Sequence, residues 1–576
     1  MKNLKTQLAV LLLSTLCSFT GAYGQVIPRG DAATLPEARL TQSQPATSGP
    51  IVQEQETVLY TFTGEADGLL PEAGLIRDGE GNLYGTTVYG GDDSGCSVFG
   101  NPGCGVVFKL DPSGAETVLY TFTGGADETN PSGLIRDDDG NLYGVSGIFG
   151  GGPVGTVFKL APPAQTGDAW THTVLYTFCS QPNCTDGQVP FAGPIRDAAG
   201  NLYGTTYGGG EGCSGYGGCG VVYKLDRKGN ETVLYSFCPA GYGNCTDGAY
   251  PEAGLTQDAA GNLYGTTSSG GANQGTVFKL APPAQQGGVW TETVLYSFIG
   301  GTDGGQPQAS VIQDAAGNIY GTTLVGGDSG CSVFGSGCGV VFKLAPPAQP
   351  GGAWTETVLH TFTGGTDGGT PYAGVIQDAA GNLYGTTWFG GLAAPPCDSF
   401  CGVVFKLDTS ANETVLYSFT GAADGANPLA GVIEDAAGNL YGTAGGGGNL
   451  GTFCQGEGGC GVVFKLAPAG VSVSPTSLNF GNVVLGLRAK KVVTLENPGI
   501  DPVEIGPITF SVTTGDASQF TDHVFCPANL GAGKSCTIAV FFTPDAAGTD
   551  AATLNIVTSA PGSPIEVPIT AAGIEK

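Results

Sequence analysis

Histidines, carboxylates and cysteines are the residue types of this chain that could carry catalysis or hold a ligand. The sequence has only three histidines, His172, His360 and His523. The first two lie beside or within segments that alternate like β-strands, which does not favour a histidine-centred zinc site or a Ser-His-Asp triad. We therefore expect no catalytic residue, no metal and no cofactor.

Among the carboxylates, one aspartate recurs four residues before a proline in every copy of an internal repeat. Its positions are Asp67, Asp127, Asp186, Asp247, Asp303, Asp367 and Asp424. We interpret it as part of the scaffold, because aspartate oxygens accept hydrogen bonds from N–H groups of their own loop. A ring of ligands is the alternative. The run 137–141 resembles a calcium loop, but five copies read D-A-A-G-N there, so we interpret it as a hairpin.

The residue that follows this proline differs between copies and is our candidate for ligand recognition. The candidates are Glu72, Phe191, Glu252, Gln308, Tyr372 and Leu429. Such aromatic and polar side chains could stack on sugar rings or contact a peptide, or they could pack one repeat against the next. A carboxylate pair such as Glu72 and Glu252 would suit a glycosidase or lyase if both lined one cleft.

Sixteen cysteines remain when Cys17 is assigned to a signal peptide, and they form eight couples that are local in sequence. The couples are Cys96/Cys104, Cys179/Cys184, Cys213/Cys219, Cys238/Cys245, Cys331/Cys338, Cys397/Cys401, Cys454/Cys460 and Cys526/Cys536. An even number of cysteines in an exported chain predicts disulfides. Metal binding is the alternative, but the couples are far apart in sequence, their spacing varies and no histidine accompanies them.

The N-terminal segment has the features of a signal peptide. Lys2 and Lys5 precede an apolar stretch over 8–19, and small residues at 22 and 24 predict cleavage before Gln25. The apolar stretch is too short to cross ~30 Å of hydrocarbon. We expect residues 1–24 to be removed, residues 25–56 to form a linker, and a soluble product to reach the periplasm, the cell surface or the medium of a bacterium.

Composition excludes several classes of protein. Glycine and proline together make about 24% of the chain, roughly twice the usual share, which is typical of a β protein dense in turns. The chain has 21 basic and 50 acidic residues, and the resulting net charge of −29 repels nucleic-acid phosphates and anionic lipids. We expect no nucleic-acid partner and no membrane insertion.

A repeat of about 60 residues must position these groups. The string T-V-L recurs in seven copies, at Thr57, Thr117, Thr173, Thr232, Thr293, Thr357 and Thr414. Each copy alternates over four short segments separated by glycine turns, which predicts four strands. Seven such meanders predict a β-propeller over 57–466, in which the strand from Thr57 to Phe62 completes the blade formed by 430–466. This topology places all the propeller's cysteine couples at one face. An open solenoid is the alternative.

Two families resemble parts of the sequence. The strings G-N-L-Y-G-T-T, G-x-V-F-K-L and E-T-V-L-Y-S-F, over about 57–466, resemble the GloVer repeat of exported bacterial proteins. That resemblance implies a propeller and no defined activity; copy two departs from it at Val145-Ser146. The segment 474–481 together with Cys526 and Cys536 resembles the choice-of-anchor D domain, a relative of the ASPM/SPD-2/Hydin group. It implies an Ig-like domain over 471–573.

The predicted chain is therefore all-β, with a seven-bladed propeller closed by an N-terminal strand and followed by an Ig-like β-sandwich. We expect an exported, monomeric, non-enzymatic binding or cell-surface-associated protein that presents a disulfide-bordered face to an extracellular glycan or protein. The alternatives are a propeller enzyme acting on extracellular polysaccharide and a structural component of the envelope.

Overall fold

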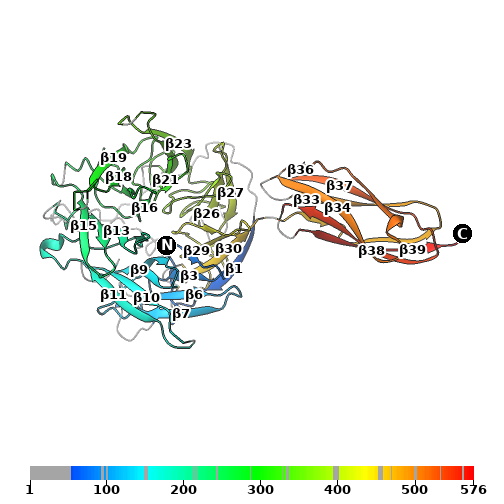
Figure 1. The fold of residues 1–576 in the computed structure, drawn as a ribbon, viewed down its shortest axis with the longest axis horizontal. Coiled ribbons are helices and arrows are strands. Elements are labelled where there is room, and N and C mark those ends of the chain that lie inside the picture. Colours follow the sequence, from blue (N-terminus) through cyan, green and yellow to red (C-terminus); the bar gives the residue numbers. More distant parts are fainter. Residues whose placement is uncertain are drawn as a thin grey trace, which may run out of the picture. The chain divides into compact units, whose positions relative to one another are not determined.

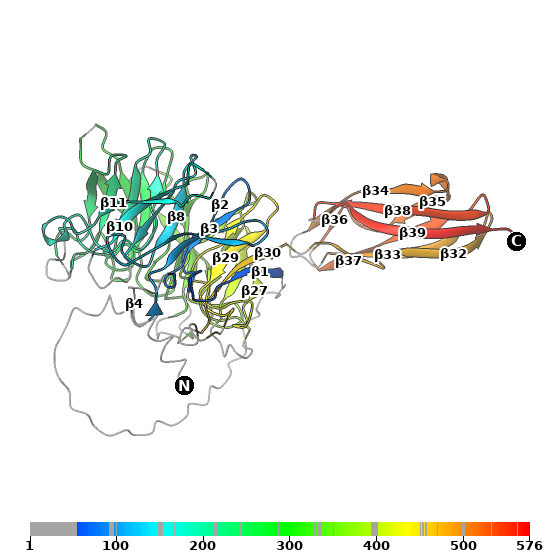
Figure 2. The same ribbon diagram turned by 90° about the horizontal axis from the view of Figure 1, so that it is seen from below.

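The computed structural model describes residues 54–91, 97–98, 101–147, 154–165, 167–211, 213, 217–241, 244–285, 287–327, 330–331, 337–349, 351–392, 401–449, 451, 454, 458–468, 470–497, 502–531, 533–560 and 563–576. The chain divides into two compact units (Figures 1 and 2). The repeat unit comprises Thr57–Ile433 and Tyr441–Lys465, and the C-terminal unit comprises Leu466–Lys576 with two short segments, 54–56 and Glu434–Leu440. The predicted signal peptide lies outside the described residues.

Seven four-stranded sheets account for the repeats, and we number them in chain order. Sheet 1 contains β2 (Ile76–Arg77), β3 (Leu83–Thr86), β6 (Val106–Leu110) and β7 (Glu116–Thr121). Sheet 2 contains β8 (Ser132–Arg136), β9 (Leu142–Ser146), β10 (Thr156–Ala161) and β11 (Thr171–Thr177). Sheet 3 contains β12 (Ile195–Arg196), β13 (Leu202–Thr206), β14 (Val221–Leu225) and β15 (Glu231–Ser236). Sheet 4 contains β16 (Thr256–Gln257), β17 (Leu263–Thr267), β18 (Thr276–Ala281) and β19 (Thr291–Ser297).

The remaining sheets follow the same order. Sheet 5 contains β20 (Ile312–Gln313), β21 (Ile319–Thr323), β22 (Val340–Ala345) and β23 (Thr355–Thr361). Sheet 6 contains β24 (Ile376–Gln377), β25 (Leu383–Thr387), β26 (Val403–Leu407) and β27 (Glu413–Ser418). Sheet 7 contains β28 (Ile433–Glu434), β29 (Leu440–Ala444) and β30 (Val462–Ala467), with β1 (Gln55–Thr61) as its fourth strand. A small hairpin of β4 (Ser97–Val98) and β5 (Asn101–Pro102) lies between β3 and β6. Figure 1 shows the seven sheets grouped around a common centre.

Sheet 7 joins the two ends of the repeat region. Its strand order is β1-β30-β29-β28, so the earliest described strand lies beside the last strand of the last copy. The Phe62 N–H donates to the Gly461 carbonyl at 3.1 Å, and the Leu70 N–H donates to the Cys460 carbonyl at 3.0 Å. The predicted pairing of the segment from Thr57 with copy seven is therefore present.

The turn between the first two strands of each sheet is built by its own side chains. Asp78 accepts hydrogen bonds from the Asn82 N–H at 2.9 Å, the Asn82 amide at 2.8 Å and the Tyr84 hydroxyl at 3.0 Å. Gly81 reverses the chain at φ +89°, which a residue with a Cβ rarely adopts. The same aspartate–asparagine contacts recur at Asp137, Asp197, Asp258, Asp314, Asp378 and Asp435. The D-x-x-G-N segments, the acidic run of copy two included, are hairpin turns.

The inner strands are shorter than the apolar segments suggest. Six of them have two residues, and only β8 has five. In sheet 1, Ile76 pairs with Tyr84 and Arg77 with Leu83, so Ala73 lies outside the strand. Its carbonyl accepts a hydrogen bond from Thr443 of sheet 7 at 3.2 Å instead. These segments bond to the neighbouring sheet, and that is why the ladder within their own sheet ends early.

Aromatic rings fill the interfaces between sheets. The Phe that follows each outer strand meets an aromatic ring in the third strand of the next sheet, edge to face. The pairs are Phe122–Phe158, Phe178–Tyr223, Phe237–Phe278, Phe298–Phe342, Phe362–Phe405, Phe419–Phe464 and Phe62–Phe108, with centroids 5.0 to 5.3 Å apart. The seventh pair joins sheet 7 to sheet 1 with the geometry of the other six.

The C-terminal unit contains two sheets, with strand orders β31-β33-β37-β35 and β32-β39-β38-β34-β36. The first comprises β31 (Ser472–Ser474), β33 (Ala489–Asn497), β37 (Lys534–Phe542) and β35 (Phe520–Val524). The second comprises β32 (Leu478–Val484), β39 (Ile565–Ile574), β38 (Gly548–Thr558), β34 (Val503–Thr514) and β36 (Asn529–Leu530). Their alternating inward residues share one apolar core, which includes Val493, Ile538, Leu554 and Val567. This is the predicted Ig-like arrangement.

The described residues contain no α-helix, and their only helical turns are the 3-10 segments η1 (Pro182–Cys184) and η2 (Ala517–Gln519). The chain is all-β, as predicted. In the part of the chain that the structure describes, no helix has the length and apolarity needed to span a membrane.

Candidate functional site

The loops that could carry function gather at one end of each sheet. In six sheets a β-bridge connects the loop that enters the inner strand with the loop that follows the second strand. The bridges are Leu69–Tyr89, Gln188–Gly208, Ala249–Ser269, Gly305–Val325, Gly369–Phe389 and Ala426–Gly446. Because both loop classes are tied together, the residues that they carry lie at the same end. We call this the loop end of the repeat unit.

The recurring aspartate of the loop end is occupied by its own loop. Asp67 accepts hydrogen bonds from the Thr63 N–H at 2.8 Å and from the Tyr60 hydroxyl at 3.0 Å. Equivalent bonds reach Asp127, Asp186, Asp247, Asp303, Asp367 and Asp424. Burial opposes ionisation of Asp127, yet its hydrogen bonds from Thr123 and Tyr120 hold its pKa below the ordinary value. These bonds give the aspartates the scaffold role that we expected.

The six candidate recognition residues are all half-buried, and they have different neighbours. Phe191 meets Tyr207 edge to face at 5.4 Å, and Tyr207 stacks on Tyr250 at 4.8 Å with an interplanar angle of 19°. These three rings come from copies three and four and form one aromatic group, the Phe191 group. Tyr372 meets Trp388 edge to face at 6.2 Å. Gln308 and Leu429, also half-buried, occupy the same position in copies five and seven.

The two glutamates at this position lie in different surroundings. Glu252, in copy four, is half-buried, and burial raises its pKa to about 7 although a hydrogen bond from Ser268 opposes the shift. Glu72, in copy one, lies against the backbone of sheet 7, since a Cβ on Gly445 would be 3.7 Å from its Cγ. Copies one and four are not consecutive, so each carboxylate has its own set of neighbours.

A second set of carboxylates, on the outer strands, was not among the residues predicted from the sequence. Glu116, Glu231, Glu292, Glu356 and Glu413 stand on outer strands, and each has a buried Oε1 with no hydrogen-bond partner among the described residues. Burial raises the pKa of the first four to about 7 and that of Glu413 to about 8, with a smaller contribution from the loop aspartate of the adjoining sheet. We call them the interface glutamates. The recurring E-T-V-L string was the available signal, with His172 in place of glutamate in copy three.

The histidines lie apart, in sheets 2 and 5 and in the C-terminal unit. His172 stacks on Tyr120 at 4.4 Å, and burial lowers its pKa. His360 Nε2 lies 3.6 Å from Asp367 Oδ2. His523 packs on Phe525 with centroids 4.5 Å apart.

Six of the eight predicted cysteine couples are disulfides between described residues. They are Cys179–Cys184, Cys213–Cys219, Cys238–Cys245, Cys331–Cys338, Cys454–Cys460 and Cys526–Cys536. Cys104 and Cys401 are also disulfide-bonded, whereas Cys96 and Cys397 lie outside the described residues. Every described disulfide of the repeat unit belongs to a loop at the loop end.

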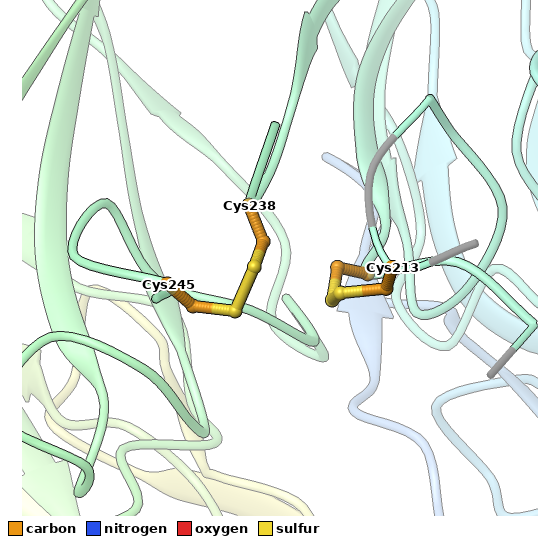
Figure 3. A group of neighbouring side chains, drawn as sticks. Cys213, Cys238 and Cys245 are labelled. Atoms are coloured by element: carbon orange, nitrogen blue, oxygen red, sulfur yellow. A yellow bond between two sulfur atoms is a disulfide. The ribbon is translucent and has the colours of Figure 1, made fainter. Parts of the chain in front are cut away.

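Two of these disulfides lie side by side, although the two cysteine couples are separated in sequence. The sulfur atoms of Cys213, Cys219, Cys238 and Cys245 all lie within 4.8 Å of one another. Figure 3 shows the bond between Cys238 and Cys245 next to the disulfide of Cys213. Three of the four cysteines are buried, and Cys245 is half-buried. In the disulfide form these sulfurs have no thiolate to offer a metal.

One family model matches the C-terminal unit, and a solved domain is similar to part of this chain. The family described as "Abnormal spindle-like microcephaly-assoc'd, ASPM-SPD-2-Hydin" matches residues 465–564. The ASH/PapD-like domain of human CEP192 is 17% identical and covers 19% of this chain and 88% of that domain, with a TM-score of 0.15. Ser474–Pro475 and Ser563–Pro564 have cis peptide bonds in this unit.

Solved structures similar to this chain include two proteins. A gluconolactonase, XC5397 from Xanthomonas campestris, is 14% identical and covers 59% of this chain and 95% of that protein, with a TM-score of 0.32. A luciferin-regenerating enzyme is 13% identical and covers 73% of this chain and 95% of that protein, with a TM-score of 0.33. No curated protein matches the sequence.

The family described as "Gloeobacter/Verrucomicrobia repeat" matches the chain at residues 47–217, 99–335, 214–453 and 334–494. Together these overlapping matches span all seven sheets. On this basis the chain belongs to the Gloeobacter/Verrucomicrobia repeat family and carries a C-terminal ASPM-SPD-2-Hydin domain.

Proposed function

We propose that this chain is an exported, non-enzymatic binding protein whose loop end recognises an extracellular glycan or protein. In this proposal the seven sheets are the blades of a β-propeller that β1 closes. Three contacts support closure: β1 pairs with β30, Phe62 packs on Phe108, and Thr443 donates to Ala73. Each repeats, between sheets 7 and 1 or within sheet 7, a contact found elsewhere along the chain.

The observation that carries the binding proposal is the asymmetry of the loop end. The scaffold aspartates recur in every copy, as do the Asp, Gly and Asn of the hairpin turns, whereas the position after the loop proline holds Glu, Ser, Phe, Glu, Gln, Tyr and Leu in turn. Residues that are identical in all seven copies maintain the fold of the repeats, and only residues that differ between copies can recognise an asymmetric ligand. In the Phe191 group, Phe191 and Tyr250 are half-buried and Tyr207 is buried, and Glu252 follows Tyr250 by two residues. Aromatic rings with a polar group nearby are typical of sites that bind sugar rings or peptides.

The disulfides support export and a rigid loop end. Local disulfides persist in oxidising compartments. Each closes a short loop, so the loops that would contact a ligand lose little conformational entropy on binding.

A glycan and peptidoglycan array probed with the oxidised full chain tests the proposal. We expect a defined ligand, and we expect Phe191→Ala to weaken its binding by at least ~10-fold because one aromatic contact is lost. Phe525→Ala, at a 59% exposed ring of the C-terminal unit, is the matched control and should bind normally. A ligand that binds Phe191→Ala as tightly as the wild type would contradict placement at this group. An array without any ligand would favour a structural envelope role.

The raised pKa of Glu252 supports one alternative, a glycosidase or lyase. A carboxyl with a pKa of about 7 is protonated often enough at neutral pH to act as a general acid. Turnover of extracellular polysaccharide that Glu252→Gln and Glu72→Gln each abolish would establish this function. Turnover that survives both changes, or none at all, would remove it.

A further inference from the structure

We propose that Cys213, Cys219, Cys238 and Cys245 form a tetrathiolate zinc site when their two disulfides are reduced. This inference concerns a metal site and is independent of the proposed ligand-binding role. It rests on the mutual placement of the four sulfurs, on their burial and on how their loops are held.

The sulfurs are already close to the arrangement that zinc requires. A tetrahedral site with Zn–S bonds of ~2.3 Å places its sulfurs about 3.8 Å apart. The four sulfur atoms here lie within 4.8 Å of one another, so small side-chain movements suffice once the S–S bonds are broken. As disulfides, Cys213, Cys219 and Cys238 are at most 2% exposed, so an ion held between these positions would be shielded from solvent.

Hydrogen bonds hold the two loops in place independently of the disulfides. The Cys219 carbonyl accepts from the Tyr250 N–H at 2.9 Å, which ties the loop of Cys219 to the loop that carries Cys238 and Cys245. The Cys238 N–H donates to Asp247 Oδ2 at 2.9 Å, and the Cys245 carbonyl accepts from the Gly271 N–H at 2.7 Å. Reduction therefore leaves three of the four cysteine backbones anchored.

The chemistry balances with a named reductant. A phosphine takes up one oxygen from water for each disulfide and yields two thiols, so two equivalents convert the pair of disulfides into four thiols. Zinc then displaces the four thiol protons and forms four Zn–S bonds. The same sulfurs would thus alternate between two disulfides in an oxidising compartment and one zinc ion in a reducing one.

This pairing of couples follows from the loop topology. Cys213 and Cys219 lie in the loop after the second strand of sheet 3, and Cys238 and Cys245 lie in the next loop that enters an inner strand. The corresponding loop beside Cys331 and Cys338 has no cysteine; there the two sulfurs lie against Gly364, 2.8 Å from where its Cβ would be. The Cys331 couple is therefore a matched control with two sulfurs instead of four.

The test uses the full chain, reduced with a phosphine under anaerobic conditions and titrated with zinc against a chromophoric chelator. We expect one tightly bound zinc per chain, release of protons on binding, and the absorption spectrum of tetrahedral tetrathiolate cobalt when Co²⁺ replaces zinc. Cys213→Ser/Cys219→Ser should weaken zinc binding by more than ~100-fold, the upper end of what changes outside the ligand shell cost. Cys331→Ser/Cys338→Ser should bind as the wild type does.

Circular dichroism and thermal melts establish that each variant is folded before titration. Three results would overturn the proposal: no tight zinc in the reduced wild type, equal binding by both double variants, or a cobalt spectrum that is not tetrahedral. Loss of folded structure on reduction, even with zinc present, would overturn it too.

Discussion

Raising the pH from 5 to 8 should destabilise the repeat unit because its interface glutamates are buried. Glu116, Glu231, Glu292 and Glu356 have pKa values raised to about 7, and that of Glu413 is raised to about 8, chiefly by burial. In the unfolded chain these carboxyls return to about 4.5. The folded state therefore binds more protons than the unfolded state between these two limits, and stability falls as pH rises through them.

The size of this effect follows from the pKa shifts. One pKa unit corresponds to ~1.4 kcal/mol. For a fully buried glutamate whose pKa rises from 4.5 to 7 on folding, the free energy of unfolding would therefore fall by about 3 kcal/mol between low and high pH. These side chains are only half-buried, and solvent screening reduces the figure to ~1 kcal/mol each. Five such groups give about 5 kcal/mol, which is a large fraction of the ~5–15 kcal/mol that stabilises a typical domain.

The aspartates of the hairpin turns have lowered pKa values, and they determine how the stability of the repeat unit changes at acid pH. Asp78, Asp137, Asp197, Asp258, Asp314 and Asp378 have pKa values below 3.8; burial opposes this shift, but the bonds from their asparagines prevail. A lowered folded pKa contributes stability that is complete above the unfolded value and is lost as pH falls through the folded one. The repeat unit should therefore be most stable near pH 5.

Thermal unfolding at constant ionic strength and scan rate, followed by near-ultraviolet circular dichroism, measures this profile. We expect the melting temperature to fall steadily from pH 5 to pH 8. Replacing all five interface glutamates by glutamine keeps their shape, removes their ionisation and should make the profile much less steep; Glu252, whose pKa is also raised to about 7, leaves a small slope. Glu211→Gln, at an exposed site, should leave it unchanged. A melting temperature that is constant or rises toward pH 8 in the wild type, or a slope as steep after the fivefold replacement as before it, would refute the reasoning.

Two further predictions concern packing. Phe62→Ala should cost about 3–5 kcal/mol of unfolding free energy, the same as Phe298→Ala, because both rings fill equivalent interfaces; a cost below ~1 kcal/mol for Phe62→Ala in denaturant unfolding would argue against a closed ring. Gly321→Ala should cost about 1–3 kcal/mol, since its Cβ would lie 2.6 Å from Cζ of Phe342, whereas Gly79→Ala meets nothing within 4 Å and should be neutral by the same assay.

Local rules made much of the fold predictable from sequence. The strands alternate, the D-x-x-G-N turns form their own hydrogen bonds, and the cysteine couples are local, so each can be recognised within about ten residues of sequence. Seven copies of this pattern also predicted that β1 pairs with β30, because copy seven lacks its fourth strand and the repeat region begins with a strand of that type.

The sequence did not show which side chains become buried between neighbouring copies. The interface glutamates resemble exposed strand residues in the sequence, because each is followed by a threonine, and four of these five threonines are exposed. Their burial comes from the adjoining sheet, which no local pattern shows. For the same reason the sequence did not reveal that Cys213 lies close to Cys238. Their separation along the chain argued against a shared site, but loops at the same end of neighbouring sheets lie close together even when they are far apart in sequence.

Copy two shows how one missing residue changes an interface. In five interfaces a threonine hydroxyl of the second strand donates to a carbonyl of the next sheet, as Thr205 does to Ala253. Both interfaces of sheet 2 lack this bond: Val145 has no hydroxyl, and the buried Thr86 hydroxyl has no partner among the described residues.

The two interfaces lack the bond for different reasons. Val145 replaces the threonine at the interface with sheet 3, whereas at the interface with sheet 1 the inner segment of copy two is one residue shorter than that of copy one, with only Ser and Gly between Pro131 and Leu134. The shortened segment extends the ladder of β8 to five residues and draws Gly133 close to Gly193, where a Cβ on Gly193 would meet the Gly133 carbonyl oxygen at 2.3 Å. At the other interface Asn130 donates to the Val88 carbonyl at 2.7 Å, as Asn427 does to the Trp388 carbonyl at 3.2 Å in copy seven. Because the segment lies at the inner edge of its sheet, this deletion breaks the sevenfold pattern at the centre of the repeat unit, next to the copy that supplies Phe191 and Tyr207. A ligand approaching the loop end would therefore meet an asymmetric centre as well as asymmetric loops.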